Sequence, residues 1–290
     1  MVSGICGVGT QPADVSETLM KSRSLSDPSL AIMAVLLLTV AFASAYVGLK
    51  LGVQYHINDE CCRLPLSRSL ILSVKEKLGL VRFYSEIGQD KWASESMFPG
   101  VKNGFFVDVG SADGTYWSNT KALEEKGWHG ICIDPFPKNM QDRACQIFRE
   151  VVFSQSGKQL KFWAPQHSFW SGIPETLDPA SKALMEQEEP QFTEFTTVTL
   201  GDILERAKAP RFINFMSMDI EGGEFEALKG FPFDKYKIGA LAIEHGFREP
   251  KRSDIKALME NHGYKRLYSL VQDDLYVPAE NFRTVWQSNW

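Results

Sequence analysis

The 290-residue sequence predicts an α/β fold with a doubly wound, mostly parallel sheet, preceded by a single transmembrane helix. Three observations support this prediction. Short apolar runs alternate with segments of helical periodicity from about residue 81 onward. Glycines and acidic residues directly follow several of these runs. One other apolar stretch, residues 30–49, is twenty residues long and contains no charged side chain.

The composition is that of a globular chain, with 44% hydrophobic, 12% aromatic and 23% charged residues. Such a chain can bury enough apolar surface to fold, which excludes extensive disorder. The 22 glycines and 14 prolines follow no period, which excludes a collagen-like chain. A net charge of -5 argues against a nucleic-acid partner, because nucleic-acid binding requires a basic surface.

Residues 30–50 are predicted to form the membrane anchor. A helix of twenty apolar residues spans roughly 30 Å, the thickness of the hydrocarbon core of a bilayer. A buried core helix rarely runs so far without a polar face. A cleaved signal peptide is a second alternative, because Ala43-Ser44-Ala45 resembles a cleavage site. We expect an uncleaved anchor between an N-terminal tail, residues 1–29, and an amphipathic connector, residues 51–80.

The orientation in the membrane depends on a small difference in basic residues. The tail carries two Lys or Arg residues and residues 50–78 carry five, which favours a cytoplasmic location for the chain after the anchor. No Asn-x-Ser/Thr acceptor site occurs in the sequence, so no glycosylation signal marks the lumenal side.

The first half of the predicted domain, which extends over residues 81–290, begins with a buried strand at 104–110 that ends on a glycine. A helix at 117–126 ends before Gly127, a residue type that closes helices. A second strand at 130–134 is stopped by two prolines. A helix at 140–148 and strands at 150–154 and 160–164 follow. Residues 165–195 are rich in Pro, Ser, Glu and Gln and are expected to be an insertion, either a substrate lid or a surface loop.

The second half repeats the alternation of helices and strands. Helices are predicted at 199–207 with Thr199 as N-cap, at 224–229, and at 253–262 with Ser253 as N-cap. Strands are predicted at 213–219 and 238–244. The last two strands, 264–270 and 275–277, are expected to pair across Asp273-Asp274 as an antiparallel hairpin.

The cysteines predict neither a metal site nor a disulfide framework. Cys132 falls in a predicted strand and Cys145 in a predicted helix, so both are expected to be packing residues. Cys61 and Cys62 follow the anchor and are expected to be surface residues, with palmitoylation as the alternative.

Candidate ligand-binding residues gather at the carboxyl ends of the predicted strands, where open parallel sheets bind ligands. The glycines after the first strand follow neither the dinucleotide fingerprint nor the phosphate-loop pattern. An acidic glycine loop suits a cationic or zwitterionic ligand. Asp134 ends the second strand 26 residues after Asp108, a spacing at which a carboxylate accepts hydrogen bonds from ribose hydroxyls.

At these residues the chain resembles the FkbM-type methyltransferases, a branch of the class I S-adenosylmethionine-dependent enzymes. The resemblance covers roughly residues 83–280 and rests on motifs that occur in order: Gln89–Trp92, Phe106–Gly114, Ser118–Thr120, Gly130–Pro135, Met216–Glu224, Ile243–His245, Gly263–Tyr264 and Asp273–Val277. It implies a Rossmann-like class I methyltransferase fold, with a seven-stranded sheet whose last strand is antiparallel and with S-adenosylmethionine at the carboxyl end of the first strand.

The resemblance also implies roles for individual residues. The methionine side of the cofactor pocket would be shaped by the glycine-loop residues Asp108, Gly110, Ser111, Asp113 and Gly114. Asp134, where the family more often has Glu, would hold the ribose. Gln89 and Asp90 would close over the cofactor, and Ser154 would lie at the adenine edge.

The candidate catalytic residues are Asp219, Glu221, Glu244 and His245. A hydroxyl acceptor must lose its proton during methyl transfer, and a placed carboxylate or histidine can take it. Glu224 and Glu226 have a structural alternative, since acidic residues stabilise helix N-termini. A divalent metal held by these oxygen ligands is possible but is not expected.

The sequence therefore predicts a membrane-anchored S-adenosylmethionine-dependent methyltransferase that modifies a hydroxyl group of a glycan, a lipid or a small metabolite. The alternative is a catalytically silent membrane-bound scaffold or trafficking factor that retains the methyltransferase fold. The intact glycine loop and Asp134 favour the enzyme. Gly246 stands where many family members have Asn, a difference that concerns acceptor recognition.

Overall fold

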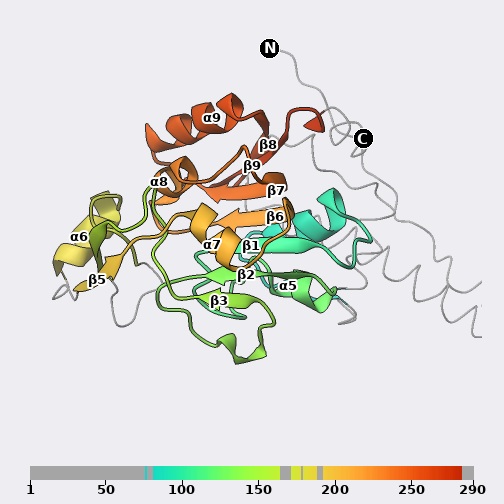
Figure 1. The fold of residues 1–290 in the computed structure, drawn as a ribbon, viewed down its shortest axis with the longest axis horizontal. Coiled ribbons are helices and arrows are strands. Elements are labelled where there is room, and N and C mark those ends of the chain that lie inside the picture. The colour runs from blue at the N-terminus through green and yellow to red at the C-terminus, as the bar shows by residue number, and fades with distance from the viewer. Residues whose placement is uncertain (1–75, 77–80, 164–170, 178, 188–191, 283–290) are drawn as a thin grey trace, which may run out of the picture. The chain divides into compact units, whose positions relative to one another are not determined.

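The computed structural model describes residue 76 and residues 81–163, 171–177, 179–187 and 192–282. These residues form a seven-stranded sheet with helices on both faces and a separate two-stranded sheet beside it (Figure 1). The strand order of the large sheet is β3-β2-β1-β6-β7-β9-β8.

The large sheet is parallel except at one strand. Its strands are β1 (Phe105–Val109), β2 (His129–Ile133), β3 (Gln146–Phe148), β6 (Phe212–Met218), β7 (Lys237–Glu244), β8 (Tyr264–Leu270) and β9 (Asp273–Pro278). Only β9 runs antiparallel to its neighbours β7 and β8. The predicted Rossmann-like sheet with an antiparallel last strand is confirmed. The order reverses direction between β1 and β6, and such a switch point opens a ligand crevice at the carboxyl ends of the strands.

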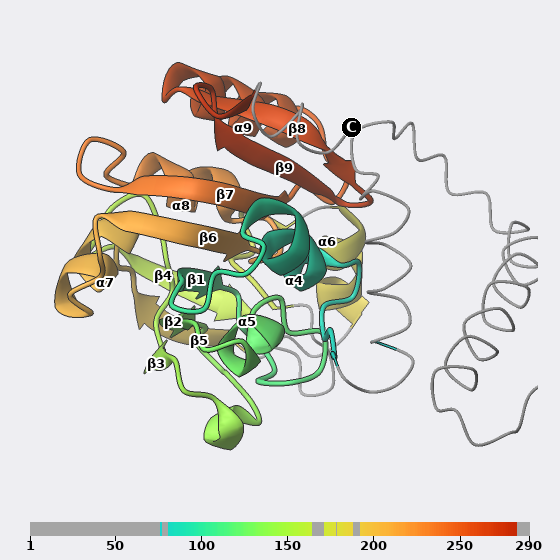
Figure 2. The same ribbon diagram turned by 90° about the vertical axis from the view of Figure 1, so that its right-hand side faces the viewer.

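Two helical layers cover the sheet. One layer contains α4 (Gln89–Lys91), which continues into the π-helical segment η1 (Trp92–Met97), together with α5 (Lys121–Glu125) and the 3-10 turn η2 (Met140–Asp142). The other layer contains α7 (Leu200–Arg206), α8 (Glu224–Lys229) and α9 (Lys251–Asn261). Figure 2 shows α4 and α5 in front of the sheet, where the Trp92 ring packs edge-on against Phe215 of β6 at 6.2 Å.

The alternation of side chains along each strand builds two cores at once. On β1, Val107 and Val109 pack with α7 and α8, whereas Phe106 packs with Trp92 and Leu123 on the opposite face. Because both faces are covered, the central strands are apolar at almost every position. This explains why continuous apolar runs located them in the sequence.

The predicted insertion, residues 165–195, contributes to the small two-stranded sheet. Strand β4 (Gln159–Trp163) pairs antiparallel with β5 (Phe192–Thr196), and helix α6 (Pro179–Gln187) lies between them in the chain. The parts of the insertion at 165–170, 178 and 188–191 lie outside the described residues. Gly172 pairs with Trp163, and Ile173 packs with Phe162, so the insertion is joined to β4.

Three local predictions are wrong. Residues 140–148 form the turn η2 and the edge strand β3 instead of a helix. Residues 150–154 form no strand, because Val152 makes only an isolated bridge with Val198. Asp273 and Asp274 begin β9 instead of forming the hairpin turn, since Asp274 is buried and accepts hydrogen bonds from Arg252 and Ser269.

Cys132 and Cys145 pack in the core as expected, but the expectation that the cysteines form no disulfide is wrong for these two. Cys132 of β2 and Cys145, which precedes β3, form a disulfide bond with their Cα atoms 5.9 Å apart. The parallel pairing of β2 with β3 brings the two positions together. This contact could not be predicted because residues 140–148 were expected to form a helix.

None of the helices in the described part of the chain is long and apolar enough to cross a membrane. The predicted tail and anchor lie outside the described residues, as does the connector apart from Glu76. Thr199 caps α7 as predicted, its side chain accepting a hydrogen bond from the backbone N–H of Asp202 at 3.2 Å. Ser253 does not cap α9, whose N-cap is Pro250.

Candidate active site

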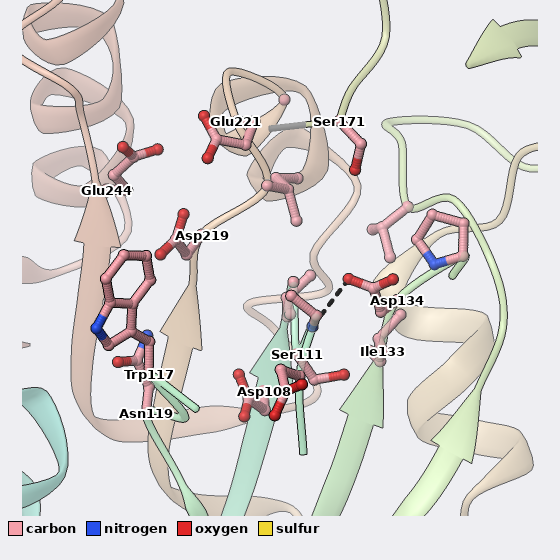
Figure 3. A pocket seen from close by; sticks show the side chains of 18 of the residues that line it. Asp108, Ser111, Trp117, Asn119, Ile133, Asp134, Ser171, Asp219, Glu221 and Glu244 are labelled. Carbon is pink, nitrogen blue, oxygen red and sulfur yellow. Dashed lines mark hydrogen bonds between the residues drawn. The ribbon is translucent and has the colours of Figure 1, made fainter. Parts of the chain in front are cut away.

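A cavity of about 410 Å³ opens at the carboxyl ends of β1, β2, β6 and β7 (Figure 3). This is the crevice that the reversal of strand order creates. Its lining includes most of the residues predicted as functional: Gln89, Asp108, Gly110, Ser111, Asp113, Asp134, Asp219, Glu221 and Glu244. Segments from five parts of the chain therefore converge at the place that the sequence predicted.

The glycine loop after β1 touches two neighbouring backbones directly. Gly110 has a φ of 90°, and a Cβ atom added there would lie 1.6 Å from the backbone oxygen of Asp219. A Cβ atom at Gly114 would lie 2.3 Å from the backbone oxygen of Asn139. The backbone N–H of Gly110 donates to Ile133 O at 2.8 Å, so this loop fits closely between the ends of β2 and β6.

The carboxyl groups of Asp108 and Asp113 differ in their hydrogen-bond partners and in their pKa values. Asp108 is buried, and it accepts a hydrogen bond from the Thr120 hydroxyl at 2.5 Å. Burial raises the pKa of Asp108, which Arg143 partly opposes. Asp113 accepts hydrogen bonds from the backbone N–H groups of Thr115 and Tyr116 at 2.9 and 2.8 Å. Burial opposes ionisation of Asp113, but these hydrogen bonds hold its pKa below the usual value. Asp113 therefore fixes the shape of the loop.

Asp134 stands at the edge of the cavity just after β2. Its Oδ2 accepts a hydrogen bond from the backbone N–H of Ala112 at 3.0 Å, and its Oδ1 accepts one from Phe136 at 2.7 Å. Burial raises the pKa of Asp134. Each carboxylate oxygen can accept a second hydrogen bond. Asp134 is thus held in place and still able to receive a pair of hydroxyl groups from a ribose.

Two carboxyl groups, those of Asp219 and Glu244, lie at the end of the cavity away from Asp134. Figure 3 shows Asp219 from the end of β6 and Glu244 from the end of β7 on the same side as Trp117, away from Asp134. Burial and the nearby Asp273 raise the pKa of Asp219 well above its usual value. Burial and Asp219 raise the pKa of Glu244 to about 9. Arg248 and Lys251 oppose this rise only in part, so Glu244 holds a proton at neutral pH.

Glu221 and Glu224 differ in exposure and in role. Glu221 lines the cavity with a φ of 57°, an uncommon left-handed conformation for a residue other than glycine. Glu224 is fully buried and accepts hydrogen bonds from the backbone N–H groups of Ile220 at 3.1 Å and Gly222 at 3.0 Å. Lys251 donates to the other oxygen of Glu224 at 2.8 Å. Glu224 thus has the structural role that was the alternative for it.

Three polar atoms in the wall of the cavity have no hydrogen-bond partner among the described residues: Gln89 Oε1, Ser111 Oγ and Glu244 Oε2. Gln89 uses its amide nitrogen to donate to Asp273 at 3.0 Å, which leaves its carbonyl oxygen available. Buried polar groups without partners are uncommon in folded proteins and are often satisfied by a ligand. These atoms fit a polar ligand that carries hydrogen-bond donors.

Four of the predicted site residues do not line the cavity: Gly114, which packs against the Asn139 backbone, and the side chains of Asp90, His245 and Ser154. Asp90 accepts hydrogen bonds from Tyr84, Ser85 and Lys91 and holds the start of α4. His245 accepts a hydrogen bond from the backbone N–H of Phe247 at Nδ1, and its Nε2 lies 3.5 Å from Asp274. Ser154 donates to Glu226 at 2.9 Å. The structure brings none of these three side chains to the carboxylates at the ends of β6 and β7.

Other cavity residues were not singled out as site residues from the sequence. They include Tyr116, Trp117, Asn119, Phe162, Ile173 and Arg248. Trp117 has a φ of 56° and lies 4.5 Å from the Tyr116 ring, at the mouth of the cavity. An exposed aromatic pair directly after a glycine loop is a signal that could have been used. Phe162 and Ile173 come from distant segments and carry no local signal.

The carboxylates of the cavity do not form a preassembled metal site. In the part of the chain that the structure describes, the one group of three potential ligands within 4.8 Å of one another is Glu124, Cys132 and Cys145. The two sulfur atoms in that group are bonded to each other. The metal alternative therefore has no preformed ligand set among the described residues.

Comparison with known proteins identifies one family. Residues 108–266 match the family model described as the Methyltransferase FkbM domain. No curated protein matches the chain. The matched range covers more than half of the 290 residues and includes the glycine loop, Asp134 and the carboxylates at the ends of β6 and β7.

Proposed function

Because the chain belongs to the FkbM methyltransferase family, we propose that it is an S-adenosylmethionine-dependent methyltransferase that transfers a methyl group to a hydroxyl. The observation that carries the proposal is the division of the cavity. Asp134 lies at one end, two proton-binding carboxyl groups, Asp219 and Glu244, lie at the other, and the glycine loop runs between them.

S-adenosylmethionine supplies an electrophilic methyl group on a sulfonium. On this proposal, Asp134, the glycine loop and Gln89 bind and orient it along the cavity. Asp134 accepts hydrogen bonds from the ribose hydroxyls, and the orphaned oxygens of Gln89 and Ser111 bond to the amino-acid part. Gly110 lets the loop lie flat against the end of β6, which leaves the space that the ligand needs. Positioning of this kind supplies much of the rate enhancement in a displacement reaction.

The carboxyl groups at the opposite end are proposed to handle the acceptor proton. As the acceptor oxygen attacks, its proton must pass to a base within hydrogen-bond reach. Glu244 is the better candidate because its Oε2 has no partner among the described residues. Its pKa of about 9 makes the carboxylate a stronger base than an ordinary glutamate. A nearby sulfonium favours the ionised form that must be present before the reaction.

The chemistry of this end favours an acceptor rich in hydrogen-bond donors. Asp219, Glu221 and Glu244 offer carboxylate oxygens, and Trp117 offers an aromatic face beside them (Figure 3). Flat aromatic faces bind the apolar sides of sugar rings, and carboxylates accept hydrogen bonds from hydroxyls. A glycan, a lipid headgroup or a small polyhydroxylated metabolite fits this lining.

We also propose that residues 30–50 anchor the enzyme in a membrane as a single-pass helix. The support for this part of the proposal is the uncharged apolar run at 30–49, which is long enough to cross a bilayer. An anchored enzyme would meet acceptors that are themselves attached to or confined near the membrane.

The binding of S-adenosylhomocysteine by the purified protein tests the proposal. Isothermal titration calorimetry should give a saturable signal with one site per chain, and Asp134→Ala should weaken it. The alternative of a silent scaffold predicts no binding even at near-millimolar ligand. That result would contradict the enzyme and favour the scaffold.

A further inference from the structure

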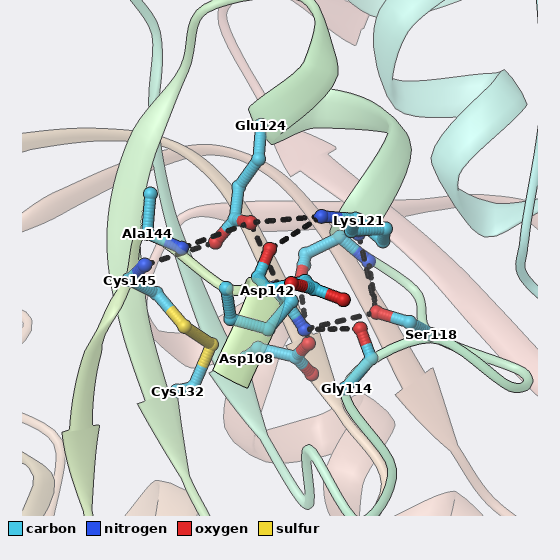
Figure 4. The surroundings of a disulfide bond; sticks show 11 residues. Asp108, Gly114, Ser118, Lys121, Glu124, Cys132, Asp142, Ala144 and Cys145 are labelled. Atoms are coloured by element: carbon cyan, nitrogen blue, oxygen red, sulfur yellow. Dashed lines mark hydrogen bonds and ion pairs between the residues drawn. A yellow bond between two sulfur atoms is a disulfide. The ribbon is translucent and has the colours of Figure 1, made fainter. Parts of the chain in front are cut away.

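The disulfide between Cys132 and Cys145 closes a loop next to the cofactor end of the cavity (Figure 4). We call residues 132–145 the cystine loop. Both cysteines are buried, and the loop between them contains only one three-residue turn, η2, as regular structure. It is followed directly by β3, an edge strand of three residues. The regular hydrogen bonding available to hold this segment is therefore small.

The cystine loop carries the ribose-binding candidate and also supports the glycine loop. Asp134 belongs to it and holds Ala112 through a hydrogen bond of 3.0 Å. The backbone N–H of Lys138 donates to Ala112 O at 2.7 Å, and Gly114 donates back to Lys138 O at 2.9 Å. The side chain of Asn139 donates to Asp113 at 2.5 Å. Two backbone contacts and two carboxylates thus join the cystine loop to the glycine loop.

Arg143 extends this connection to the buried end of the site. Its fully buried guanidinium donates to the Thr120 hydroxyl at 2.7 Å, and that hydroxyl donates to Asp108 at 2.5 Å. The same guanidinium reaches Gly114 O at 3.3 Å and Ser118 Oγ at 3.2 Å. Arg143 does not itself line the cavity, so it acts on the site through Thr120 and Ser118 and through its charge near Asp108.

Glu124 of α5 fixes Arg143 and the disulfide end of the loop together. Its Oε2 accepts hydrogen bonds from Arg143 Nε at 2.9 Å and from the backbone N–H of Ala144 at 3.3 Å. Its Oε1 accepts one from the backbone N–H of Cys145 at 3.0 Å (Figure 4). A displacement of Cys145 would therefore move Arg143, and with it the chain of contacts that ends on Asp108.

We propose that the Cys132–Cys145 disulfide is a positioning element of the cofactor site, and that the chain binds S-adenosylmethionine tightly only when this disulfide is formed. The inference rests on the proposed function. The disulfide fixes Cys145 relative to β2. Glu124 bonds to both Cys145 and Arg143, and Arg143 bonds to Gly114 of the glycine loop. Asp134 lies in the cystine loop and bonds to the glycine loop directly. When the bond is open, the loop keeps its polar contacts but loses the covalent cross-link between its two ends.

A site that needs this disulfide restricts the compartment in which the enzyme works. Disulfides persist in oxidising compartments and are rare in the cytosol, where thiols are kept reduced. A site that depends on a disulfide is competent on the lumenal or extracellular side of a membrane. This reverses the orientation that the count of basic residues favoured, a count that rests on a difference of three residues.

Reduction is a defined chemical step. A dithiol such as dithiothreitol attacks one sulfur of the disulfide as a thiolate and releases the other cysteine as a thiolate. The second thiol of the reagent then attacks the resulting mixed disulfide and releases the remaining cysteine. The protein gains two electrons and two protons as two cysteine thiols, and the reagent leaves as its cyclic disulfide. Because both cysteines are buried, substitution is a more direct way to open the bond than reduction.

The test compares the full-length oxidised protein with the double variant Cys132→Ala/Cys145→Ala. The affinities of S-adenosylhomocysteine and of its 2′-deoxyribose analogue are measured for both proteins by calorimetry. We expect the double variant to bind S-adenosylhomocysteine at least tenfold more weakly. We also expect it to distinguish less between the two ligands, because a displaced Asp134 no longer recognises the 2′-hydroxyl.

A matched control separates positioning from stability. Ile255→Ala removes a buried side chain of α9, in the core on the other side of the sheet from Trp92 and Leu123. It should lower the melting temperature while leaving both affinities and their ratio unchanged. If the double variant unfolds at the assay temperature, the oxidised protein is titrated with dithiothreitol below its melting temperature. Loss of binding should then follow the appearance of two new thiols.

The outcomes have distinct meanings. Equal ligand affinities and an equal ratio in the oxidised protein and the double variant, or unchanged binding after two thiols appear, would overturn this inference and leave the proposed function standing. A failure of the oxidised wild-type protein to bind S-adenosylhomocysteine would overturn the proposed function, and this inference with it. Weaker binding with a reduced ratio in the double variant alone would support the inference.

Discussion

Replacing Glu244 with glutamine is expected to change how the stability of the protein depends on pH. Glutamine has nearly the same shape as glutamate but does not titrate. The pKa of Glu244 is about 9 in the folded protein, against an ordinary value of 4.5. Between these values the folded state binds more protons than the unfolded state, so the wild-type protein loses stability as the pH rises. At about 1.4 kcal/mol per pKa unit, the loss is roughly 3 kcal/mol at pH 7 and roughly 6 kcal/mol at pH 9.

Glu244→Gln should remove most of that loss. The free energy of unfolding is measured by urea titration at about pH 5, 7 and 9, with tryptophan fluorescence as the signal. The variant should match the wild-type protein near pH 5 and exceed it by several kcal/mol near pH 9. Some slope should remain, because the raised pKa values of Asp219 and Asp273 act in the same direction.

The control for this experiment is Glu205→Gln, at an exposed carboxylate that pairs with Lys235 at 2.9 Å. The free energy of unfolding of Glu205→Gln should depend on pH in the same way as that of the wild-type protein. Parallel stability curves for the wild-type protein and Glu244→Gln across the whole range would refute the reasoning. They would mean that Glu244 is ionised in the folded protein and that its burial is offset by a cation.

Three further predictions concern the cofactor end of the cavity and the membrane. Asp134→Ala should weaken S-adenosylhomocysteine binding by about 10- to 100-fold in calorimetry, since hydrogen bonds to charged groups contribute about 1.5–3 kcal/mol; an unchanged affinity would remove Asp134 from the site. Gly110→Ala should cost at least ~3 kcal/mol of stability in urea unfolding, because its Cβ would lie 1.6 Å from a backbone oxygen. Gly100→Ala, at a φ of 79° with open space around it, should cost only about 1–2 kcal/mol, and equal costs would contradict the close approach. Deleting residues 1–50 should move the protein from the membrane to the soluble fraction after centrifugation, and its continued sedimentation would contradict the anchor.

The central strands of the sheet were predictable because burial on both faces makes them continuous apolar runs. β1, β2, β6 and β7 all lie within one or two residues of their predicted ends. β3 was missed because an edge strand of three residues, with Gln146 and Ile147 exposed, carries no such run. The disulfide was missed for the same reason, since its geometry depends on the pairing of β2 with β3.

The site was predictable to the extent that topology alone determines it. Parallel strands bring their carboxyl ends to one edge, so Asp108, Asp134, Asp219 and Glu244 could be grouped without knowledge of distances. Sequence could not distinguish Glu244 from its neighbour His245. Adjacent residues at a strand end point in opposite directions, and only Glu244 faces the cavity.

The structure of the protein in complex with S-adenosylhomocysteine tests the central claim most directly. The account predicts that the ribose hydroxyls lie within hydrogen-bond distance of Asp134. It also predicts that the sulfur points toward the space between Asp219 and Glu244. A ligand bound outside this cavity, or with its ribose away from Asp134 and its sulfur turned from these carboxyl groups, would contradict it.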